Sequence, residues 1–252
     1  MIYGSLFSGL GGGDIGFDLA GWSCAWQVER DPSCRRILAR HWPDVPKFDD
    51  VRDVTGAMLE QYGPVDAVIG GSPCQDLSVA GRRAGLAGER SGLFHEQLRI
   101  ADECAAPWLL WENVPGALSS ANGEDFATVL GLVTGFWPDV PDDGWRNAGW
   151  CVGPKRSAAW RVLDAQFVGG CRLHVDERGI GPVPQRRRRI FLVACAGAEL
   201  RGAPVSVLIE PESMRGDLEA GGEAREGVAS GIEGGARIRG DASGVTSPTI
   251  TR

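Results

Sequence analysis

The chain has 252 residues, of which 43% are hydrophobic, and this composition is sufficient to bury the core of one substantial domain. No apolar run approaches the roughly 20 residues that a membrane-spanning helix needs, and the first residues lack the basic start of a signal peptide, so we expect a cytoplasmic protein without a membrane partner. The formal net charge of −7 argues against a protein that coats nucleic acid indiscriminately, but it leaves room for a basic cleft on an acidic body.

Cysteine and arginine usage narrows the chemistry further. The seven cysteines are scattered and include no Cys-x-x-Cys pair, which predicts neither a disulfide framework nor a metal site. Lys47 and Lys155 are the only lysines, so arginine supplies nearly all the positive charge. Arginine suits bidentate contacts with phosphate and base edges, and its densest run is Gln185-Arg-Arg-Arg-Arg189.

Strand-like and helix-like segments alternate along the chain. We expect strands over residues 2–7, 24–28, 65–69, 108–111, 159–163 and 190–194. We expect helices over residues 14–20, 32–41, 93–104 and 125–133. This alternation predicts an α/β fold with a mostly parallel, doubly wound sheet, whose site lies at the carboxyl ends of the strands.

Two segments depart from this alternation. Residues 136–157 are rich in Pro, Gly, Asp and Trp, and we expect them to form a long ordered excursion that could lie against a substrate. Residues 216–244 carry many glycines and few large apolar side chains, which predicts a flexible surface segment. We therefore expect a catalytic domain over residues 1–198 and a Gly-rich, partly flexible tail over residues 199–252.

A glycine-rich turn, Phe7-Ser-Gly-Leu-Gly-Gly-Gly13, follows the first expected strand. Taken alone, it is equally consistent with a tight strand-to-helix connection. Glu29 ends the second strand, where an acid can hold ribose hydroxyls, and Asp50 follows a third segment, where it could accept from an adenine amino group. Either acid alone is more often a solvated surface residue, but together with the glycines they predict a site for a nucleoside-bearing cofactor.

A single thiol and a carboxyl group follow two further strands. Cys74 stands in Gly70-Gly-Ser-Pro-Cys74; it could be a small buried hydrophobe, but Pro73 and the open glycine loop favour a functional thiol placed like a nucleophile. Glu112 ends the next strand, where a glutamate normally points to water. Because Asn113 and Pro115 shape the turn, Glu112 can instead face the cleft.

The arginine run precedes the last expected strand of the domain. Such a run is usually a solvated patch or a phosphate contact. Strand alternation predicts that Arg187 and Arg189 point to one face and that Arg186 and Arg188 point to the other, so one pair can enter the site.

Four of these motifs, in this order across residues 1 to about 196, closely resemble those of the DNA (cytosine-5) methyltransferases. They are the S-adenosylmethionine motif Phe7-Ser-Gly-Leu-Gly-Gly12, the nucleophile loop Ser72-Pro-Cys-Gln75, the acid motif Glu112-Asn-Val114, and the Gln-x-Arg-x-Arg motif from Gln185 to Arg189. The resemblance implies a Rossmann-like, S-adenosylmethionine-dependent fold and methylation of cytosine carbon 5 in double-stranded DNA.

The resemblance also implies residue roles. Cys74 would add to ring carbon 6 of a flipped cytosine, Glu112 would bond the nitrogen 3 edge, and Arg187 with Arg189 would hold the ring oxygen. Asn113 and Gln185 would complete the catalytic set. The cofactor would be bound by Phe7, Ser8, Gly9, Leu10, Gly11, Gly12, Glu29, Asp50, Val51, Pro73 and Leu93. No metal is required.

Two departures from the family pattern suggest other readings. Residues 169–182 resemble an insertion before the arginine motif, and Ser247-Pro-Thr-Ile-Thr-Arg252 resembles the opening of a target-recognition region whose remainder is not in the chain. We therefore expect a second chain to supply the missing motifs, with weak, sequence-independent DNA binding by this chain alone. The alternatives are an enzyme of the branch that methylates RNA, and a non-catalytic subunit or fragment. A restriction partner and a phage self-protection enzyme stay equally open.

Overall fold

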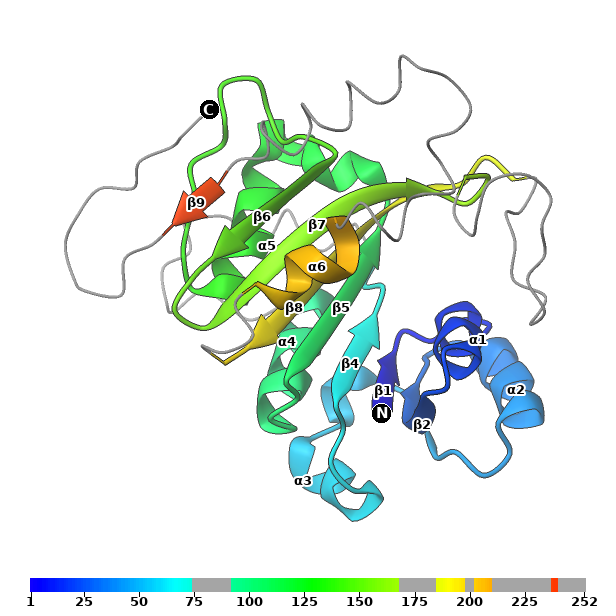
Figure 1. Cartoon of the computed structure of the whole chain (residues 1–252). Coiled ribbons are helices and arrows are strands. Elements are labelled where there is room, and N and C mark those ends of the chain that lie inside the picture. Colours follow the sequence, from blue (N-terminus) through cyan, green and yellow to red (C-terminus); the bar gives the residue numbers. More distant parts are fainter. Residues whose placement is uncertain (74–91, 168–184, 198–201, 210–236, 240–252) are drawn as a thin grey trace. The chain divides into compact units, whose positions relative to one another are not determined.

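The computed structural model describes residues 1–73, 92–167, 185–197, 202–209 and 237–239 (Figure 1). The chain divides into two compact units, Met1–Asn113 and Val114–Arg252. The expected domain boundary at residue 198 falls outside the described residues and stays a prediction. Among the described residues, no helix is long and apolar enough to cross a membrane.

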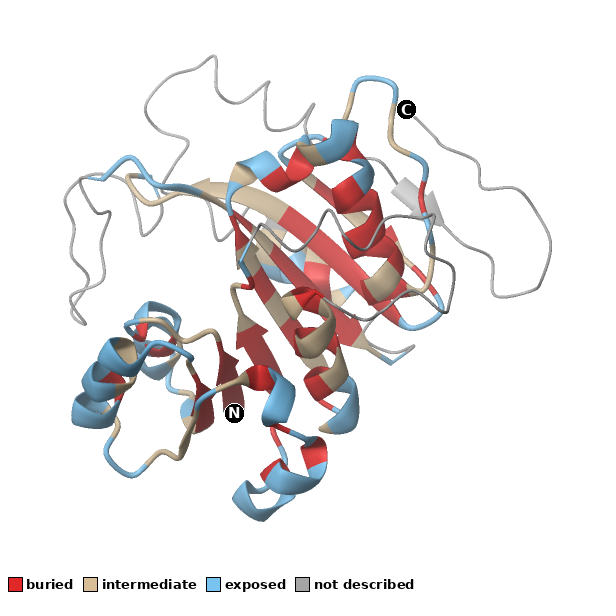
Figure 2. Ribbon diagram, turned by 180° about the vertical axis from the view of Figure 1, so that it is seen from behind, coloured by how far each residue is buried: buried red, intermediate tan, exposed pale blue. Residues whose placement is uncertain are grey.

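The first unit is built on a parallel sheet. Its strands are β1 (Ile2–Leu6), β2 (Ser23–Val28), β3 (Lys47–Phe48), β4 (Ala67–Gly70) and β5 (Trp108–Asn113). They lie in the order β3-β2-β1-β4-β5, and every pair is parallel. Strands β1 and β4 are buried along most of their length, as expected for parallel strands covered on both faces (Figure 2).

Helices connect these strands. They are α1 (Gly12–Leu19), α2 (Pro32–His41), α3 (Gly56–Leu59) and α4 (Leu93–Glu103), with short 3-10 turns η1 (Val51–Asp53) and η2 (Glu60–Tyr62). Local signals explain where α2 begins: the Asp31 carboxylate accepts from the amides of Ser33 at 2.6 Å and Cys34 at 3.1 Å, and Pro32 occupies the first turn. The core beside β1 contains Tyr3, whose ring lies 5.0 Å from that of Phe17.

The second unit contains a mixed sheet in the order β8-β7-β6-β9. Its strands are β6 (Ala148–Val152), β7 (Arg156–Asp164), β8 (Arg188–Ala196) and β9 (Arg237–Arg239), and its helices are α5 (Glu124–Thr134) and α6 (Ala203–Ile209), with 3-10 turns η5 (Pro115–Leu118) and η6 (Ser120–Gly123). Strand β7 pairs antiparallel with β6 and β8. Helices α5 and α6 lie on opposite faces of this sheet (Figures 1 and 2). The rings of Phe126, Trp145 and Trp160 meet edge to face beneath α5.

The α/β fold and its parallel sheet confirm the expectation from the sequence, and all ten expected elements are present, with ends that differ from the expected ones by no more than three residues. Five elements were missed. Strand β3 and helix α3, of two and four residues, lie between the expected helix 32–41 and the expected strand 65–69. Strand β6 lies inside the expected excursion 136–157, where Gly149 leaves room for the Trp160 ring; a Cβ atom there would lie 2.4 Å from it. Helix α6 and strand β9 lie inside the expected tail 199–252, which is therefore not uniformly without structure.

Candidate active site

The carboxyl ends of the five parallel strands are aligned in the first unit. In the sheet register Leu6 is the partner of Val28 and of Gly70, Val28 is the partner of Phe48, and Gly70 is the partner of Trp111. These five residues form one row across the sheet. Every candidate residue of this unit that follows a strand comes within a few positions of this row, which places the cofactor motifs, the nucleophile turn and the acid motif at one edge.

The glycine turn leaves β1 with an unusual backbone. Phe7, Gly9 and Gly11 all have positive φ, at 54°, 55° and 85°. A Cβ atom on Gly11 would lie 2.5 Å from the Trp42 ring, so both conformation and space require glycine there. Ser8 ties the turn to β1, because its hydroxyl lies 2.9 Å from that of Ser5. The remaining residues of the predicted turn, Leu10, Gly12 and Gly13, are exposed.

Glu29 holds this turn in place. One carboxylate oxygen accepts from the backbone N–H of Gly9 at 2.7 Å, and the other accepts from the N–H of Asp31 at 2.7 Å. The acid therefore joins the end of β2 to the glycine turn, a contact between residues 20 positions apart. Each carboxylate oxygen can accept a second hydrogen bond, so the expected ribose contact stays a prediction.

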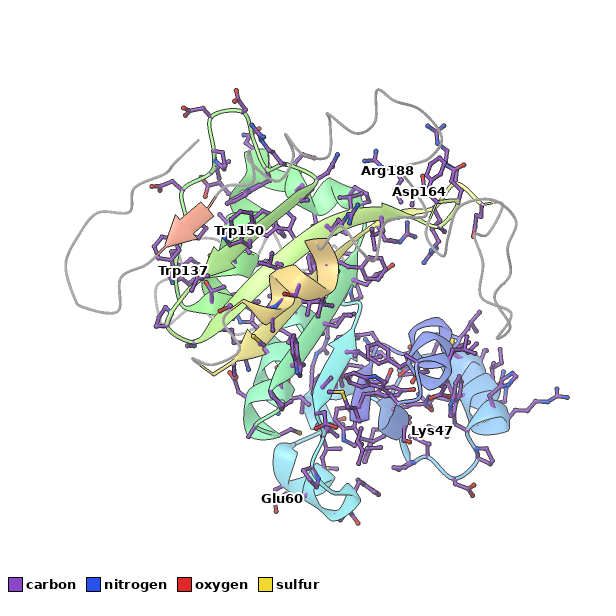
Figure 3. The ribbon with its side chains drawn as sticks, viewed as in Figure 1. Lys47, Glu60, Trp137, Trp150, Asp164 and Arg188 are labelled. Atoms are coloured by element: carbon purple, nitrogen blue, oxygen red, sulfur yellow. The ribbon has the colours of Figure 1, made fainter. Side chains whose placement is uncertain are left out.

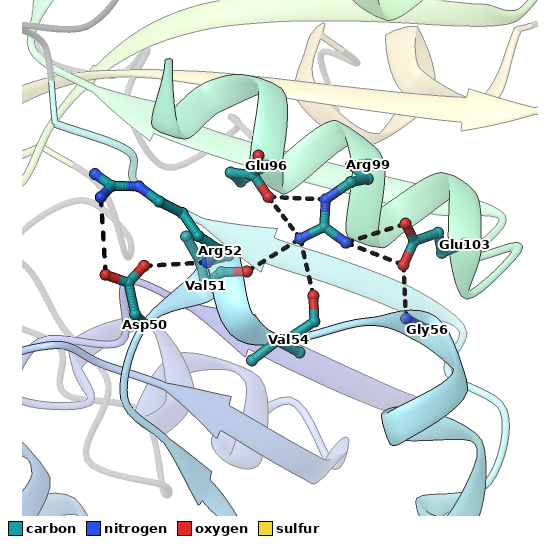
Figure 4. Close-up of polar contacts among 8 residues, drawn as sticks. All are labelled: Asp50, Val51, Arg52, Val54, Gly56, Glu96, Arg99 and Glu103. Atoms are coloured by element: carbon teal, nitrogen blue, oxygen red, sulfur yellow. Dashed lines mark hydrogen bonds and ion pairs between the residues drawn. The ribbon is translucent and has the colours of Figure 1, made fainter. Parts of the chain in front are cut away.

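Asp50 begins the turn η1. Its carboxylate accepts from the backbone N–H of Arg52 at 3.0 Å and lies 3.9 Å from the Arg52 guanidinium and 4.0 Å from that of Arg30 (Figure 4). Val51, the next residue, is buried. The carboxylates of Glu29 and Asp50, at the ends of neighbouring strands, fit the hydroxyl and amino donors of a nucleoside, so the residues present suit S-adenosylmethionine.

The turn that leads to the candidate nucleophile is anchored to β5. Cys74 itself lies outside the described residues. Ser72, two positions earlier, is buried; its hydroxyl accepts from the indole N–H of Trp111 at 3.0 Å, and its carbonyl accepts from the Asn113 amide at 3.1 Å. Pro73 is exposed. Ser72 is thus held through both its side chain and its main chain, and it precedes the thiol by two residues.

Glu112 lies beside the same turn. A Cβ atom on Gly71 would lie 2.9 Å from a carboxylate oxygen of Glu112, so this glycine allows the acid to approach the backbone. Along β5 the flanking Trp111 and Asn113 are buried whereas Glu112 is partly exposed, which is the alternation of a strand. Glu112 therefore lies beside the described start of the nucleophile motif, and the roles expected for both motifs stay predictions. Leu93, also predicted to bind cofactor, is the first residue of α4.

One buried acid near the site was missed. Asp14, in the first turn of α1, is 1% exposed, and its carboxylate accepts from Gln27 at 2.9 Å and from the Ser5 hydroxyl at 3.2 Å. Burial raises the pKa of the Asp14 carboxyl, and the hydrogen bonds from Gln27 and Ser5 oppose that rise only in part. In the sequence Asp14 follows three glycines and resembles an ordinary acid at the start of a helix. Its burial results from the folded sheet and has no signal in the sequence.

The arginine motif belongs to the second unit. Gln185 and Arg187 are exposed, whereas Arg189 is partly buried. The strand begins at Arg188, which is the register partner of Asp164 on β7 (Figure 3). Of the four arginines, only Arg188 and Arg189 lie in the strand. The expected alternation between the two faces therefore applies to these two alone. The Arg187 backbone N–H donates instead to the Asp164 carboxylate at 3.2 Å.

The chemistry of the described residues is that of a nucleotide-type site without an evident metal centre. Among them, no group of three or more His, Cys, Asp or Glu side chains could hold a metal ion. The site combines backbone amides, two carboxylates on neighbouring strands and a third carboxylate beside the turn that precedes a thiol. This arrangement can hold a nucleoside cofactor, and it places a carboxylate beside the turn that leads to Cys74.

Comparison with known proteins agrees with this description. The family model for C-5 cytosine-specific DNA methylase matches residues 1–134. The Type II methyltransferase M.AquIA of Picosynechococcus sp. is 39% identical over 195 residues, covering 75% of this chain and 69% of the relative. The DNA N-6-adenine-methyltransferase of Escherichia phage P1 is 33% identical over 273 residues, covering 96% of this chain but only 34% of the relative.

A solved structure shows the same fold. It is a protein encoded within an Escherichia coli prophage and described as a DNA modification methyltransferase, with a TM-score of 0.53 and 21% sequence identity. The match covers 78% of this chain and 47% of the other. The chain thus spans about a third of the phage P1 relative and about half of the prophage protein.

Proposed function

Because the chain belongs to the C-5 cytosine-specific DNA methylase family, we propose that it transfers a methyl group from S-adenosylmethionine to carbon 5 of cytosine in DNA. The single observation that carries the proposal is the row of strand ends from Phe48 to Trp111. This row brings the cofactor acids, the turn before Cys74 and the Glu112 carboxylate to one edge of a sheet.

The cofactor would be held by the first unit. Glu29 and Asp50 supply carboxylates for the ribose and adenine donors, and the glycine turn allows close approach of the methionine portion. The further contacts are those predicted from the sequence: Phe7, Ser8, Val51, Pro73 and Leu93. When bound, S-adenosylmethionine supplies an electrophilic methyl group. The protein's own side chains would carry out the other steps of the reaction.

Cytosine carbon 5 is a weak nucleophile, and this is why a thiol is needed. The Cys74 thiolate forms a bond to ring carbon 6, and the electron pair of the 5,6 double bond becomes available at carbon 5. Glu112 bonds the nitrogen 3 edge and stabilises the charge that develops on the ring. Once carbon 5 carries the methyl group, its proton passes to water, the electron pair of that C–H bond restores the 5,6 double bond, and Cys74 leaves carbon 6 as a thiolate.

A stacked cytosine cannot present carbon 6 to a thiol, so the base must leave the helix at a cost of a few kcal/mol. Arg187 and Arg189 would hold the ring oxygen, and other arginines would contact phosphates. A second chain that completes recognition, a cytoplasmic location, and a role in restriction-modification or phage self-protection stay predictions from the sequence.

The phage P1 relative is named for adenine N-6 methylation, which makes adenine the competing substrate. An exocyclic amino nitrogen carries its own lone pair and needs no covalent activation. Ring carbon 5 of cytosine has no such lone pair and needs covalent activation by a nucleophile. The Pro73-Cys74 turn contains a thiol that would be that nucleophile, which favours cytosine as the substrate. The match to the phage protein covers only 34% of it, so its name says little about this segment.

The test is methyl transfer from tritiated S-adenosylmethionine to duplex DNA and, separately, to transfer RNA, with the product digested to nucleosides. We expect the label in 5-methyldeoxycytidine, its loss in Cys74→Ala, and its retention in the control Cys34→Ala on α2. Label in N6-methyladenine, label only in RNA, or full activity of Cys74→Ala would contradict the proposal. Activity that requires an added second chain would support the predicted partner.

A further inference from the structure

Arg99, in the middle of α4, reaches across to the segment that follows Asp50 (Figure 4). Its Nη2 atom donates to the carbonyl oxygen of Val51 at 3.1 Å and to that of Val54 at 2.8 Å. Val51 is the first residue of η1, and Val54 directly follows the turn. One guanidinium therefore holds both ends of this turn.

The guanidinium is itself fixed by two acids on the same face of α4. Its Nε atom donates to Glu96 at 2.8 Å, and Nη1 donates to both carboxylate oxygens of Glu103 at 3.0 Å. These are i,i+3 and i,i+4 neighbours, so the helix presents the three side chains as one unit. All three guanidinium nitrogens have partners, which leaves Arg99 little freedom to move.

Glu103 extends the same contact to the end of the segment. Its Oε2 atom accepts from the backbone N–H of Gly56 at 2.6 Å. A Cβ atom on Gly56 would lie 2.7 Å from the Glu103 Cβ, so the chain can approach α4 this closely only at a glycine. Burial would raise the pKa of Glu103, but the Gly56 N–H and Arg99 outweigh it and hold the pKa below its ordinary value.

The orientation of Asp50 depends on this turn. The Asp50 carboxylate accepts from the backbone N–H of Arg52, which lies inside η1 between the two carbonyls that Arg99 holds. A shift of η1 would move that N–H and with it the carboxylate. Arg99 lies six residues after Leu93 on the same helix. Helix α4 therefore carries one predicted cofactor contact, Leu93, and also the residue that positions another, Asp50.

We propose that Arg99 is a positioning residue for cofactor binding, acting through η1 on the Asp50 carboxylate and on Val51. The inference rests on the proposed function, because it assumes that these two residues contact the nucleoside of S-adenosylmethionine. Arg99 does not contact the cofactor or the base itself. Its effect is confined to the affinity for the nucleoside end of the cofactor.

The first experiment measures cofactor binding to the full chain by calorimetry, with Arg99→Lys as the variant. Lysine keeps the charge but cannot reproduce the planar fork, so we expect Kd for S-adenosylmethionine to rise about tenfold, as for one lost charge-assisted hydrogen bond. Kd for 5′-methylthioadenosine, which lacks the amino-acid portion, should rise by the same factor. Arg36→Lys on α2, whose guanidinium donates to the neighbouring Ser33 hydroxyl at 3.0 Å, is the matched control and should bind like wild type.

Kinetics and a double mutant separate positioning from general stability. Arg99→Lys should raise the KM for S-adenosylmethionine while leaving kcat at saturating cofactor and the KM for DNA unchanged. In an Asp50→Ala background, Arg99→Lys should raise Kd by clearly less than about tenfold, because the Asp50 carboxylate on which Arg99 acts is gone and only its effect on Val51 is left. Circular dichroism and thermal melts establish that each variant is folded.

Different results would overturn the positioning role of Arg99 and the proposed function. Unchanged Kd in Arg99→Lys, a lowered kcat with unchanged KM, or additive effects with Asp50→Ala would overturn the positioning role while the proposed function stands. Wild-type protein that binds no S-adenosylmethionine would overturn the proposed function, and the positioning role with it.

Discussion

The indole N–H of Trp111 donates a 3.0 Å hydrogen bond to the hydroxyl oxygen of Ser72, and both side chains are buried. Ser72 lies two residues before Cys74, so a side chain of β5 anchors the turn that leads to the candidate nucleophile. The Asn113 amide holds the Ser72 carbonyl from the same strand at 3.1 Å. Glu112 lies between these two anchors, which links the position of the acid to that of the turn.

Replacing Trp111 by Phe removes the donor and keeps a ring against Phe94, whose centroid lies 5.4 Å away. The buried Ser72 hydroxyl then loses its partner, and we expect the unfolding free energy to fall by about 1–3 kcal/mol. Covalent trapping on DNA that contains 5-fluorocytosine should slow, with Kd for S-adenosylmethionine unchanged. Trp108→Phe, on the same strand, is the control. Equal trapping rates in the two variants would show that the Ser72 contact does not position the nucleophile.

Glu112→Gln should slow methyl transfer about 100-fold or more, because the charge on the ring loses a stabilising partner. Cofactor affinity should stay at the wild-type value, since Glu112 lies beside Gly71 and not beside the glycine turn. Single-turnover kinetics with labelled cofactor measures the rate. The exposed Glu60→Gln serves as the control (Figure 3). A rate within the range of that control would remove Glu112 from the catalytic set.

Gly11→Ala should destabilise the first unit and weaken cofactor binding. Gly11 has φ of 85°, and the new Cβ atom would lie 2.5 Å from the Trp42 ring. The backbone strain alone costs about 1–3 kcal/mol. Gly16→Ala in α1 is the matched control, because no atom outside its own stretch of helix backbone lies within 4 Å of its Cβ position among the described residues. Urea unfolding and calorimetry measure both effects, and stability equal to that of the control would contradict the assigned turn geometry.

Asp14 should give the protein a distinctive pH dependence. Because burial raises the pKa of this carboxyl in the folded state, the folded protein binds the Asp14 proton more tightly than the unfolded chain does. The unfolding free energy contributed by this group therefore falls as pH rises from about 4, the ordinary carboxyl value, through the raised pKa. Urea unfolding over this range should show the fall in wild type and a flatter profile in Asp14→Asn. Parallel profiles would mean that Asp14 titrates normally.

Local signals were sufficient to predict most elements. Helix α2 has the bounds expected for it, because its signals, an Asp31 cap followed by Pro32, act over a few residues. The parallel sheet followed from alternating apolar runs, and the shared edge followed from the geometry of parallel strands. Strand β6 was missed because a short run interrupted by Gly149 carries little periodicity. It forms because β7 offers a pairing partner.

The site shows the same division. The order of motifs along the chain is sufficient to predict which residue types come to the sheet edge: the glycine turn, the acids Glu29 and Asp50, the thiol motif and Glu112. The contacts that hold them appear only in the folded chain. Glu29 bonds Gly9, Trp111 bonds Ser72, and Arg99 bonds Val51, across separations of 20, 39 and 48 residues. Such contacts depend on strand register and helix placement, which no local pattern specifies, and so the supporting residues became visible only in the folded chain.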